Sequence, residues 1–235
     1  MATPKPSAGS VVVAIIAAAG SGTRVGGGVP KQFLKVGGRT ILELTLGRLE
    51  RHPEVDALVA VVPPRRLRAA KLMMRRHPRL VAVVAGGARR QDSVERGLRA
   101  APGGERAIVL VHDAARPLVA PELVSSIIRA ARRRGAAVPG IAPADTVKSV
   151  DGGGRVTGTL DRARLRMVQT PQGFRASWLR RAFRRAAVEG TAATDDASLV
   201  EAAGMPVVVV DGDPLNFKIT TRADLLRLRA LMRRG

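Results

Sequence analysis

Residues 11–31 read VVVAIIAAAGSGTRVGGGVPK, and they combine an apolar run with a glycine-rich, basic segment. Its first part, residues 11–19, is an unbroken apolar run of strand length that is rich in β-branched residues. Such a run is typical of a strand buried on both faces of a parallel sheet. The glycines within residues 20–28 let the backbone approach a ligand closely, and Arg24 and Lys31 add positive charge. The stretch therefore predicts a buried strand followed by a loop that binds a polyanion, most simply a chain of phosphates.

Two familiar phosphate-binding motifs do not fit this loop in full. A P-loop ends in Gly-Lys-Ser/Thr, whereas Lys31 follows Pro30 and precedes Gln32. A dinucleotide fingerprint needs a third glycine where Val25 stands, so Gly20-Ser21-Gly22 is only a partial match. Taken from the glycines alone, a glycine-rich turn with two solvated cations stays an open alternative.

Length and composition favour a single cytoplasmic domain. A chain of 235 residues fits one large domain, since about 150 residues per domain is a soft guide. There is no cysteine, which excludes disulfides, thiolate catalysis and cysteine-bound zinc, and the three histidines are scattered. Residues 1–10 lack the apolar centre of a signal peptide, so we expect a short disordered tail. No apolar run reaches the roughly 20 residues of a membrane helix.

The net charge of +21 raises the hypothesis of a nucleic-acid partner, because a basic surface releases counterions from a phosphate backbone. The charge is spread along the whole chain, however, and aromatic residues make up only 2%, too few for a base-stacking surface. We therefore expect no specific nucleic-acid partner and only weak, salt-sensitive binding to polyanions.

The remainder of the chain alternates apolar runs of strand length with helical segments. This alternation predicts an α/β fold with a doubly wound, mostly parallel sheet over residues 11–235. Further strands are expected at 56–62, 80–85, 107–111, 136–141 and 207–210. Helices are expected from Thr40, over 65–76, from Asp92 as a cap to Ala101, over 121–134 and 177–189, from Thr194, and from a Thr221 cap.

Polar clusters follow the first, third, fourth and fifth of these strands. In doubly wound sheets, ligands bind outside the carboxyl ends of the strands. We therefore expect these clusters to meet at one edge of the sheet and to form the site there.

Residues 143–169 interrupt the alternation. Residues 145–150 and 155–160 have the pattern of two strands joined by a turn at 151–154, which predicts a projecting polar hairpin. An isolated hairpin has too little core to be stable, so we expect this arm to lean on another subunit.

Seven short motifs occur in one order along the chain: AAAGSGTR with PKQF, GGARRQDSV, VHDAARP, PADTVK, LDR with QTPQGF, TDDASLVE, and NFKIT. Together they resemble the 2-C-methyl-D-erythritol 4-phosphate cytidylyltransferase family over essentially the full length after the tail. The resemblance implies a Rossmann-like nucleotidyltransferase fold and transfer of CMP from CTP to 2-C-methyl-D-erythritol 4-phosphate, with release of pyrophosphate. It also implies a Mg²⁺-dependent cytoplasmic homodimer whose subunits exchange hairpin arms.

The same resemblance implies roles for individual residues. Catalytic roles fall to Arg24 and Lys31 at the α-phosphate and to Arg162 and Lys218, which would grip the methylerythritol phosphate; Thr146 and Arg116 would add substrate contacts. Nucleotide contacts fall to Ala18, Ala19, Gly20, Gly87, Ser93 and Asp113, of which Asp113 would also lie near the Mg²⁺ bound to the triphosphate. Ala88 departs from the acidic or polar residue that some members carry beside the base.

Two other functions remain open from the sequence. One is a cytidylyltransferase with the same loop that acts on ribitol 5-phosphate or another polyol phosphate. The other is a binding protein, for nucleic acid or as a nucleotide sensor without turnover. For Ser93 the alternative to base recognition is a simple helix cap.

Overall fold

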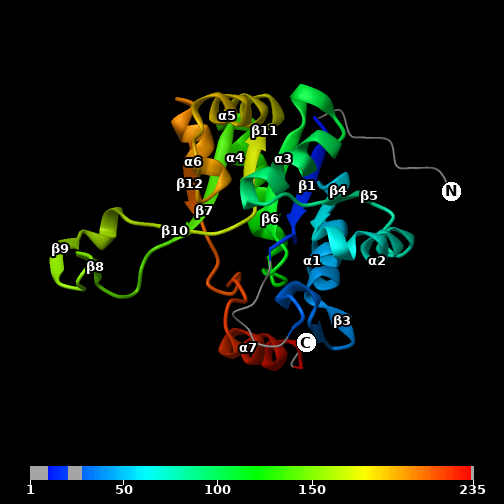
Figure 1. The fold of residues 1–235 in the computed structure, drawn as a ribbon, viewed down its shortest axis with the longest axis horizontal. Helices are drawn as coiled ribbons and strands as arrows, with labels where there is room; N and C mark the ends of the chain where they lie inside the picture. The colour runs from blue at the N-terminus through cyan, green and yellow to red at the C-terminus, as the bar shows by residue number, and fades with distance from the viewer. Residues whose placement is uncertain (1–9, 21–27, 234–235) are drawn as a thin grey trace.

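The fold is described by a computed structural model that covers residues 10–20 and 28–233. The expected tail, apart from Ser10, and the loop residue Arg24 lie outside the described residues. The chain builds a central sheet with helices on both faces and a hairpin that projects from one side (Figure 1). The predicted α/β class is therefore confirmed.

The central sheet joins two parallel blocks through one antiparallel strand. β1 lies between β4 and β6, β4 pairs with β5, and all these pairs are parallel. β11 runs antiparallel between β6 and β7, while β12 is parallel to β7. These strands are β1 (Val12–Ala17), β4 (Ala57–Val62), β5 (Leu80–Ala85), β6 (Ile108–Asp113), β7 (Ala136–Ile141), β10 (Met167–Val168), β11 (Gln172–Arg175) and β12 (Val208–Asp211).

Two layers of helices cover the sheet because its strands are apolar on both faces. Along β1, Val12, Ala14 and Ile16 pack into one core, while Val13 and Ile15 pack into the core on the opposite face. The first core contains residues of α1 (Ile41–Glu50), α2 (Leu67–Lys71) and α4 (Pro121–Arg134). The second contains residues of α3 (Arg90–Ala100), α5 (Ala176–Glu189) and α6 (Asp196–Ala202).

Three helices differ from their predicted form. The helix expected from Thr194 is α6, which begins at Asp196 with Asp195 as its N-cap. The expected single helix over 65–76 is α2 flanked by short 3-10 turns, Pro64–Arg66 and Leu72–Arg75. Only Ala70 of this whole segment is buried, so little packing holds it in one regular helix. Helix α3 begins two residues before the predicted cap, and Asp92 lies in its first turn, where it accepts the backbone N–H of Arg89 at 3.1 Å.

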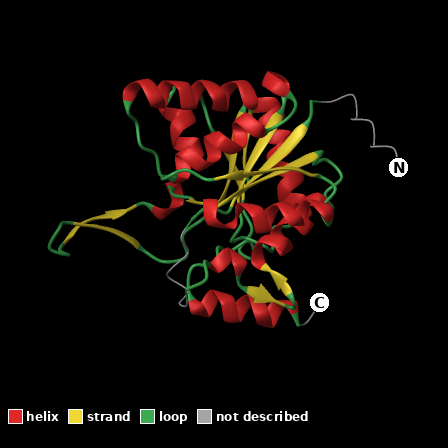
Figure 2. Cartoon of the chain, turned by 45° about the vertical axis from the view of Figure 1, so that its right-hand side comes forward, coloured by secondary structure: helices red, strands yellow, loops and turns green. Residues whose placement is uncertain are grey.

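A third, smaller core lies beside the carboxyl edge of the sheet. Here the short hairpin β2 (Lys35–Val36) and β3 (Arg39–Thr40) packs with α7 (Arg222–Met232), as Figure 2 shows near the C-terminus. Val36, Ile41, Ile219 and Leu228 meet in this core. Because Ile219 follows Lys218, this core fixes the segment that carries that lysine.

The projecting hairpin is formed by β8 (Val147–Val150) and β9 (Val156–Leu160), which pair antiparallel in a sheet of their own. Both ribbon views show it extending away from the central sheet (Figures 1 and 2). It exposes several apolar side chains, with relative exposures of 57% for Val150, 55% for Val156 and 45% for Leu160. The predicted hairpin is therefore present.

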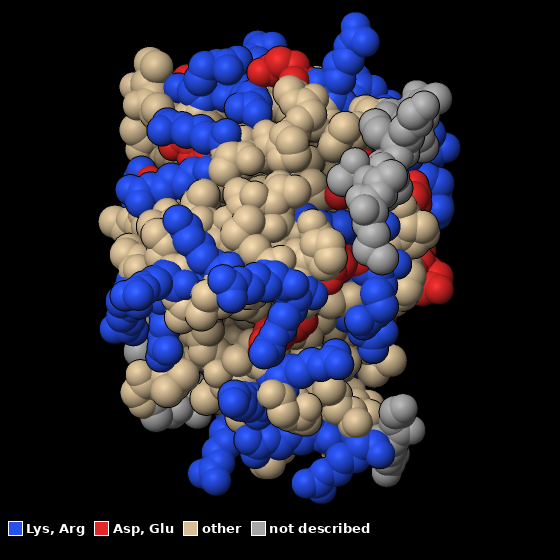
Figure 3. Space-filling model, turned by 90° about the vertical axis from the view of Figure 1, so that its right-hand side faces the viewer, with Lys and Arg blue, Asp and Glu red and all other residues tan. Residues whose placement is uncertain are grey.

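The basic composition is visible on the surface. On the face in Figure 3, Lys and Arg side chains are scattered among uncharged ones and outnumber the acidic ones. They do not form one continuous stripe in this view. Within the described part of the chain, no helix is long and apolar enough to cross a bilayer.

Candidate active site

A cavity of about 740 Å³ lies at the carboxyl edge of the sheet. This volume falls in the range of pockets that enclose small-molecule ligands. Its wall is built by the segments that follow β1, β4, β5 and β6, together with Lys218 from the segment that leads into α7. The described lining includes Ala17–Gly20, Lys31, Gln32, Pro63–Arg65, Gly87–Arg90, Ser93, Asp113–Ala115 and Lys218.

The expected edge site is therefore only partly as predicted. The segment after β4 lines the cavity, although no polar cluster was predicted there, while the polar residues after β7 are absent from its described lining. The cause is topological: antiparallel β11 lies between β7 and β6 and displaces β7 from the pocket. The residue pattern gave no sign of this inserted strand.

The backbone that follows β5 lies very close to the end of β1 on one side and to the first turn of α3 on the other. A Cβ at Gly86 would lie 2.2 Å from Cβ of Ala19, and one at Gly87 would lie 2.4 Å from Cβ of Asp92. Both positions thus require glycine for reasons of space. The close approach brings the backbone at Ala18–Gly20 and at Gly87 into the wall of one pocket.

Ser93 is held by two hydrogen bonds within this wall. Its hydroxyl donates to the Arg89 carbonyl at 3.1 Å and accepts the N–H of Gly87 at 3.0 Å. Ser93 lies inside α3, so it is not the N-cap of that helix. Because its proton is already donated, the hydroxyl can offer a ligand only its second lone pair, as an acceptor.

The segment that follows the predicted polyanion loop is hydrogen-bonded to the backbone at the end of β1. Lys31 lines the cavity at the start of a short 3-10 turn, Lys31–Phe33. Beside it, the buried Gln32 donates from Nε2 to the carbonyls of Ala18 and Gly20, both at 2.7 Å. Gln32 therefore fixes the backbone on either side of Ala19. We did not single out this residue from the sequence, although its polar side chain next to Lys31 was the available signal.

Asp113 is surrounded by three cations. Its Oδ2 lies 2.8 Å from Nζ of Lys218 and 3.8 Å from Nε of Arg116, and its Oδ1 lies 4.0 Å from Nη2 of Arg90. Burial alone would raise the pKa of Asp113, but Lys218 and Arg90 outweigh it, so the pKa lies below its usual value. The carboxylate is therefore ionised and faces the cavity with 11% of its side chain exposed.

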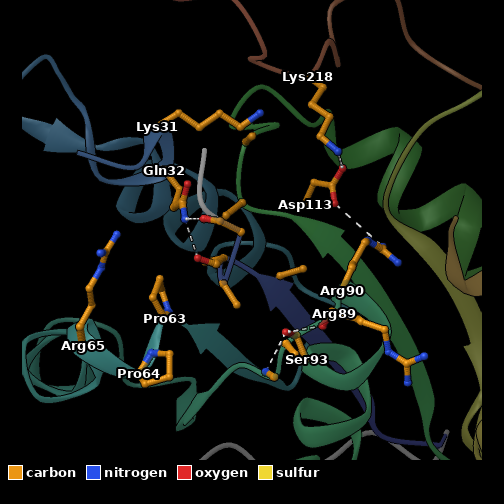
Figure 4. A pocket seen from close by; sticks show the side chains of 18 residues that line it. Lys31, Gln32, Pro63, Pro64, Arg65, Arg89, Arg90, Ser93, Asp113 and Lys218 are labelled. Atoms are coloured by element: carbon orange, nitrogen blue, oxygen red, sulfur yellow. Dashed lines mark hydrogen bonds and ion pairs between the residues drawn. The ribbon is translucent and has the colours of Figure 1, made fainter. Parts of the chain in front are cut away.

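Lys218 is carried by a segment that is pinned to the sheet. The side chain of the fully buried Asn216 donates from Nδ2 to the backbone carbonyl of Thr170 at 2.8 Å. The backbone carbonyl of Asn216 accepts from Nη1 of Arg116 at 2.6 Å. Arg116 thus supports the backbone near Lys218 and is absent from the described cavity lining. Figure 4 shows Lys31 and Lys218 on one side of the opening and Ser93 on the other.

Two of the expected substrate residues lie elsewhere. Thr146 and Arg162 belong to the projecting arm, and both are exposed. Arg162 donates from Nη1 to the Ala144 carbonyl at 2.7 Å, which joins the two ends of the arm. Neither is among the described residues that line the cavity.

The cavity suits a divalent cation that arrives with a phosphate ligand. Asp113 is the only carboxylate among its described lining residues, and the described chain contains no cluster of three or more potential metal ligands. Mg²⁺ in such sites is held by one or two carboxylates together with substrate phosphates and water, not by a cage of protein ligands. The residues present therefore fit a Mg²⁺–nucleotide complex.

Comparison with known sequences identifies a family. The sequence model of 2-C-methyl-D-erythritol 4-phosphate cytidylyltransferase (IspD) matches residues 12–234. The enzyme of that name from Nocardia farcinica is 48% identical over 226 residues, covering 95% of this chain and 94% of the relative. The enzyme of that name from Rhodococcus jostii is 45% identical, with 95% and 96% covered.

Solved structures agree with these sequences. The 2-C-methyl-D-erythritol 4-phosphate cytidylyltransferase from Thermus thermophilus superposes with a TM-score of 0.79 at 40% identity, covering 95% of this chain and 99% of the other. The 4-diphosphocytidyl-2C-methyl-D-erythritol synthase from Anaerococcus prevotii gives a TM-score of 0.83 at 32% identity, with 95% and 99% covered. The chain belongs to the 2-C-methyl-D-erythritol 4-phosphate cytidylyltransferase family.

Proposed function

We propose that this chain transfers CMP from CTP to 2-C-methyl-D-erythritol 4-phosphate and releases pyrophosphate, a step in the non-mevalonate route to isoprenoid precursors. Its membership of the family carries this assignment. In the reaction, a phosphate oxygen of the acceptor attacks the α-phosphorus of CTP, and the bond from that phosphorus to the β-phosphate oxygen breaks. No protein nucleophile is needed, so positioning and neutralisation of charge carry the catalysis.

Lys31 and Lys218 are the described cations best placed for that neutralisation. Both line the cavity, and they lie on the same side of its opening (Figure 4). We assign Lys31, together with Arg24 in the undescribed part of the loop, to the charge that develops at the α-phosphate. Lys218 would bind the acceptor phosphate. Loss of one such donor costs about 3 kcal/mol in the transition state, a rate loss of about a hundredfold.

The opposite wall suits the nucleotide. Ser93 has acceptor capacity left, and an acceptor at this place matches the exocyclic amino group of cytosine. Gly87 and Ala18–Gly20 would contribute backbone groups. Asp113, with the triphosphate, would hold Mg²⁺, which when bound lowers the negative charge between the two substrates.

The arm residues require a second subunit. Thr146 and Arg162 lie outside the cavity of their own chain. They can therefore contact the methylerythritol phosphate only if the arm covers the pocket of another copy. The exposed apolar side chains of the arm support such a contact. We therefore propose a homodimer with exchanged arms over residues 143–169 and a single nucleotidyltransferase domain over residues 11–235.

Pyrophosphate release with CTP and Mg²⁺ tests the function. We expect rapid release with 2-C-methyl-D-erythritol 4-phosphate, and far slower release with ribitol 5-phosphate or without an acceptor. Release with ribitol 5-phosphate alone would keep the chemistry and change the acceptor. Tight CTP binding without any release would favour a nucleotide sensor, and steeply salt-dependent RNA binding that ignores CTP would favour a nucleic-acid role.

A further inference from the structure

A fully buried carboxylate stands behind the pocket. Asp196, the first residue of α6, is 0% exposed, and Arg90 supplies the only partner of its side chain among the described residues. Nη2 of Arg90 lies 2.7 Å from Oδ2 of Asp196. A buried charge is very costly unless an opposite charge accompanies it. Burial raises the pKa of Asp196 even with Arg90 beside it, so its ionised form depends on Arg90 as counter-charge, and this ion pair holds the two side chains together.

The backbone that carries Asp196 is itself fixed to the sheet. Asp195 caps α6 by accepting the N–H of Ser198 at 3.0 Å, and Gln172 of β11 donates from Nε2 to Asp195 at 2.7 Å. Gln172 also accepts the N–H of Ala197 at 3.2 Å. Gln172 comes from the QTPQGF motif and the others from TDDASLVE. Neither motif contributes a described residue to the cavity lining, so their place in the site is indirect.

On its other side Arg90 faces Asp113. The same Nη2 atom lies 4.0 Å from Oδ1 of Asp113, and Arg90 lines the cavity with 33% of its side chain exposed. Figure 4 shows its guanidinium directed towards Asp113. Lys218 and Arg116 approach Oδ2 of Asp113. Each oxygen of this carboxylate thus has its own cationic neighbour, Lys218 in close contact with Oδ2 and Arg90 at ion-pair distance from Oδ1.

We propose that Arg90 is a positioning residue: anchored by Asp196, it orients the carboxylate of Asp113 towards the nucleotide and does not itself bind phosphate. This inference rests on the proposed function, which places Asp113 beside the nucleotide. Only Nη2 of Arg90 is placed against Asp196, so a direct contact with phosphate would have to use its other N–H groups, and the variants described below distinguish that contact from positioning. Its neighbour Arg89 contrasts with it, because the partner of Arg89 is Asp92, whose side chain is 29% exposed.

A double-mutant cycle distinguishes positioning from direct contact. Affinity for CTP with Mg²⁺ is measured by calorimetry without acceptor, so that no turnover enters the readout. We expect Arg90→Gln to weaken CTP binding about tenfold in the native background and less than about twofold when Asp113 is already Asn. Equal losses in both backgrounds would mean that Arg90 contacts the nucleotide directly and would overturn the proposal.

A second pair of variants separates positioning from stability. Arg90→Gln leaves the Asp196 carboxylate without its counter-charge, so the variant is expected to be less stable. The double variant Arg90→Gln, Asp196→Asn replaces the ion pair by a neutral pair of similar size. We expect it to recover the urea midpoint and to keep the weakened CTP binding. Recovery of both the urea midpoint and the CTP affinity would show that the Arg90–Asp196 ion pair acts only on stability, and it would overturn the proposal.

Two controls complete the experiment. Arg99→Ala removes an exposed arginine of the same helix that also pairs with a carboxylate, Glu95, and it should change neither CTP affinity nor the urea midpoint appreciably. Native protein assayed with CTP, Mg²⁺ and methylerythritol phosphate tests the proposed function itself. If the native protein turns over while the losses at Arg90 and Asp113 are additive, only the proposed role of Arg90 is wrong. If it does not turn over, the proposed function fails first.

Discussion

His112 lies fully buried near the end of β6, one residue before Asp113, and its hydrogen bonds determine its tautomer. Its Nε2 lies 3.0 Å from the Arg116 carbonyl, which can only accept, so Nε2 carries the proton. Its Nδ1 lies 3.1 Å from Oγ1 of Thr170, and that oxygen already accepts the N–H of Asp113. The Thr170 hydroxyl therefore donates to Nδ1. A second proton on the ring would displace the hydroxyl proton of Thr170 from this hydrogen bond and would place a charge in a fully buried position.

Acid should therefore destabilise the fold through His112. Burial is the largest influence and lowers the pKa of His112 to about 4, from 6.5 in the unfolded chain. Between these values the unfolded state binds a proton that the folded state does not, so stability falls as the pH falls through this window. The slope is at most about 1.4 kcal/mol per pH unit. We expect urea unfolding between pH 7 and pH 4 to show this loss in native protein and in His77→Gln, and less of it in His112→Gln. An equal loss in all three would contradict the assignment.

Some residues of the site could be predicted from the sequence, whereas the partner of Arg90 could not. The placement of Ser93, Lys31 and Asp113 in the cavity follows from their positions after predicted strands, which parallel topology brings to one edge. The partnership of Asp196 with Arg90 depends on a contact between segments more than 100 residues apart in the chain. From the sequence, Asp196 is indistinguishable from an ordinary acidic residue in the first turn of a helix, directly after the capping Asp195. Only the three-dimensional arrangement shows that it is buried.

Among the secondary-structure elements, the most accurate predictions are those for which residues at the ends of the element mark its bounds. Helix α4 has its predicted bounds because Pro121 suits the first turn of a helix and Gly135 follows its last residue. The strands β5 and β7 also have their predicted bounds. β10 and β11 were missed because they are short and their sequence, MVQTPQGFR, is largely polar and contains a proline. Their pairing with β7 and β6 is what stabilises them as strands.

The cap of α7 gives a prediction at this scale. Asp224 accepts four hydrogen bonds, from the backbone N–H and the hydroxyl of both Thr220 and Thr221, at 2.8–2.9 Å. Burial would raise its pKa, but these bonds outweigh it and lower the pKa of Asp224 to about 2. We expect Asp224→Ala to lower the free energy of unfolding by about 1 kcal/mol at pH 7. The cost should shrink as the pH falls from 3.8 towards 2, because in this window the carboxylate takes up a proton in the unfolded chain while the native one is still ionised.

Urea unfolding measures this cost, with Asp211→Ala as the matched control. Asp211 is an exposed carboxylate whose side chain makes no hydrogen bond or ion pair with the described residues. Its loss should change stability by no more than about 0.5 kcal/mol. Equal costs at Asp211 and Asp224 would show that general charge, and not the cap, stabilises α7.

At the scale of the whole molecule, the proposed site is divided between two places. The cavity with Lys31, Lys218 and Asp113 belongs to the main body, whereas Arg162 and Thr146 lie on an arm that extends away from it (Figure 1). One chain alone therefore cannot bring all the proposed substrate contacts together in this arrangement. The proposed two-fold dimer, in which each arm covers the other body, would resolve the separation, because each site would then draw on both chains.

Subunit mixing tests this division. Lys31→Ala damages a body and Arg162→Ala damages an arm, so in a mixed dimer one site carries both defects and the other carries neither. Random exchange makes about half of the dimers mixed, and the mixture should recover about one quarter of native turnover. Mixing Lys31→Ala with Lys218→Ala is the matched control, because both lysines lie in the same body and every mixed dimer keeps a defect in each site. Pyrophosphate release reports turnover, and native mass spectrometry of differently tagged chains reports exchange. If exchange is complete and the first mixture stays as inactive as the control, the arms do not serve the partner's site.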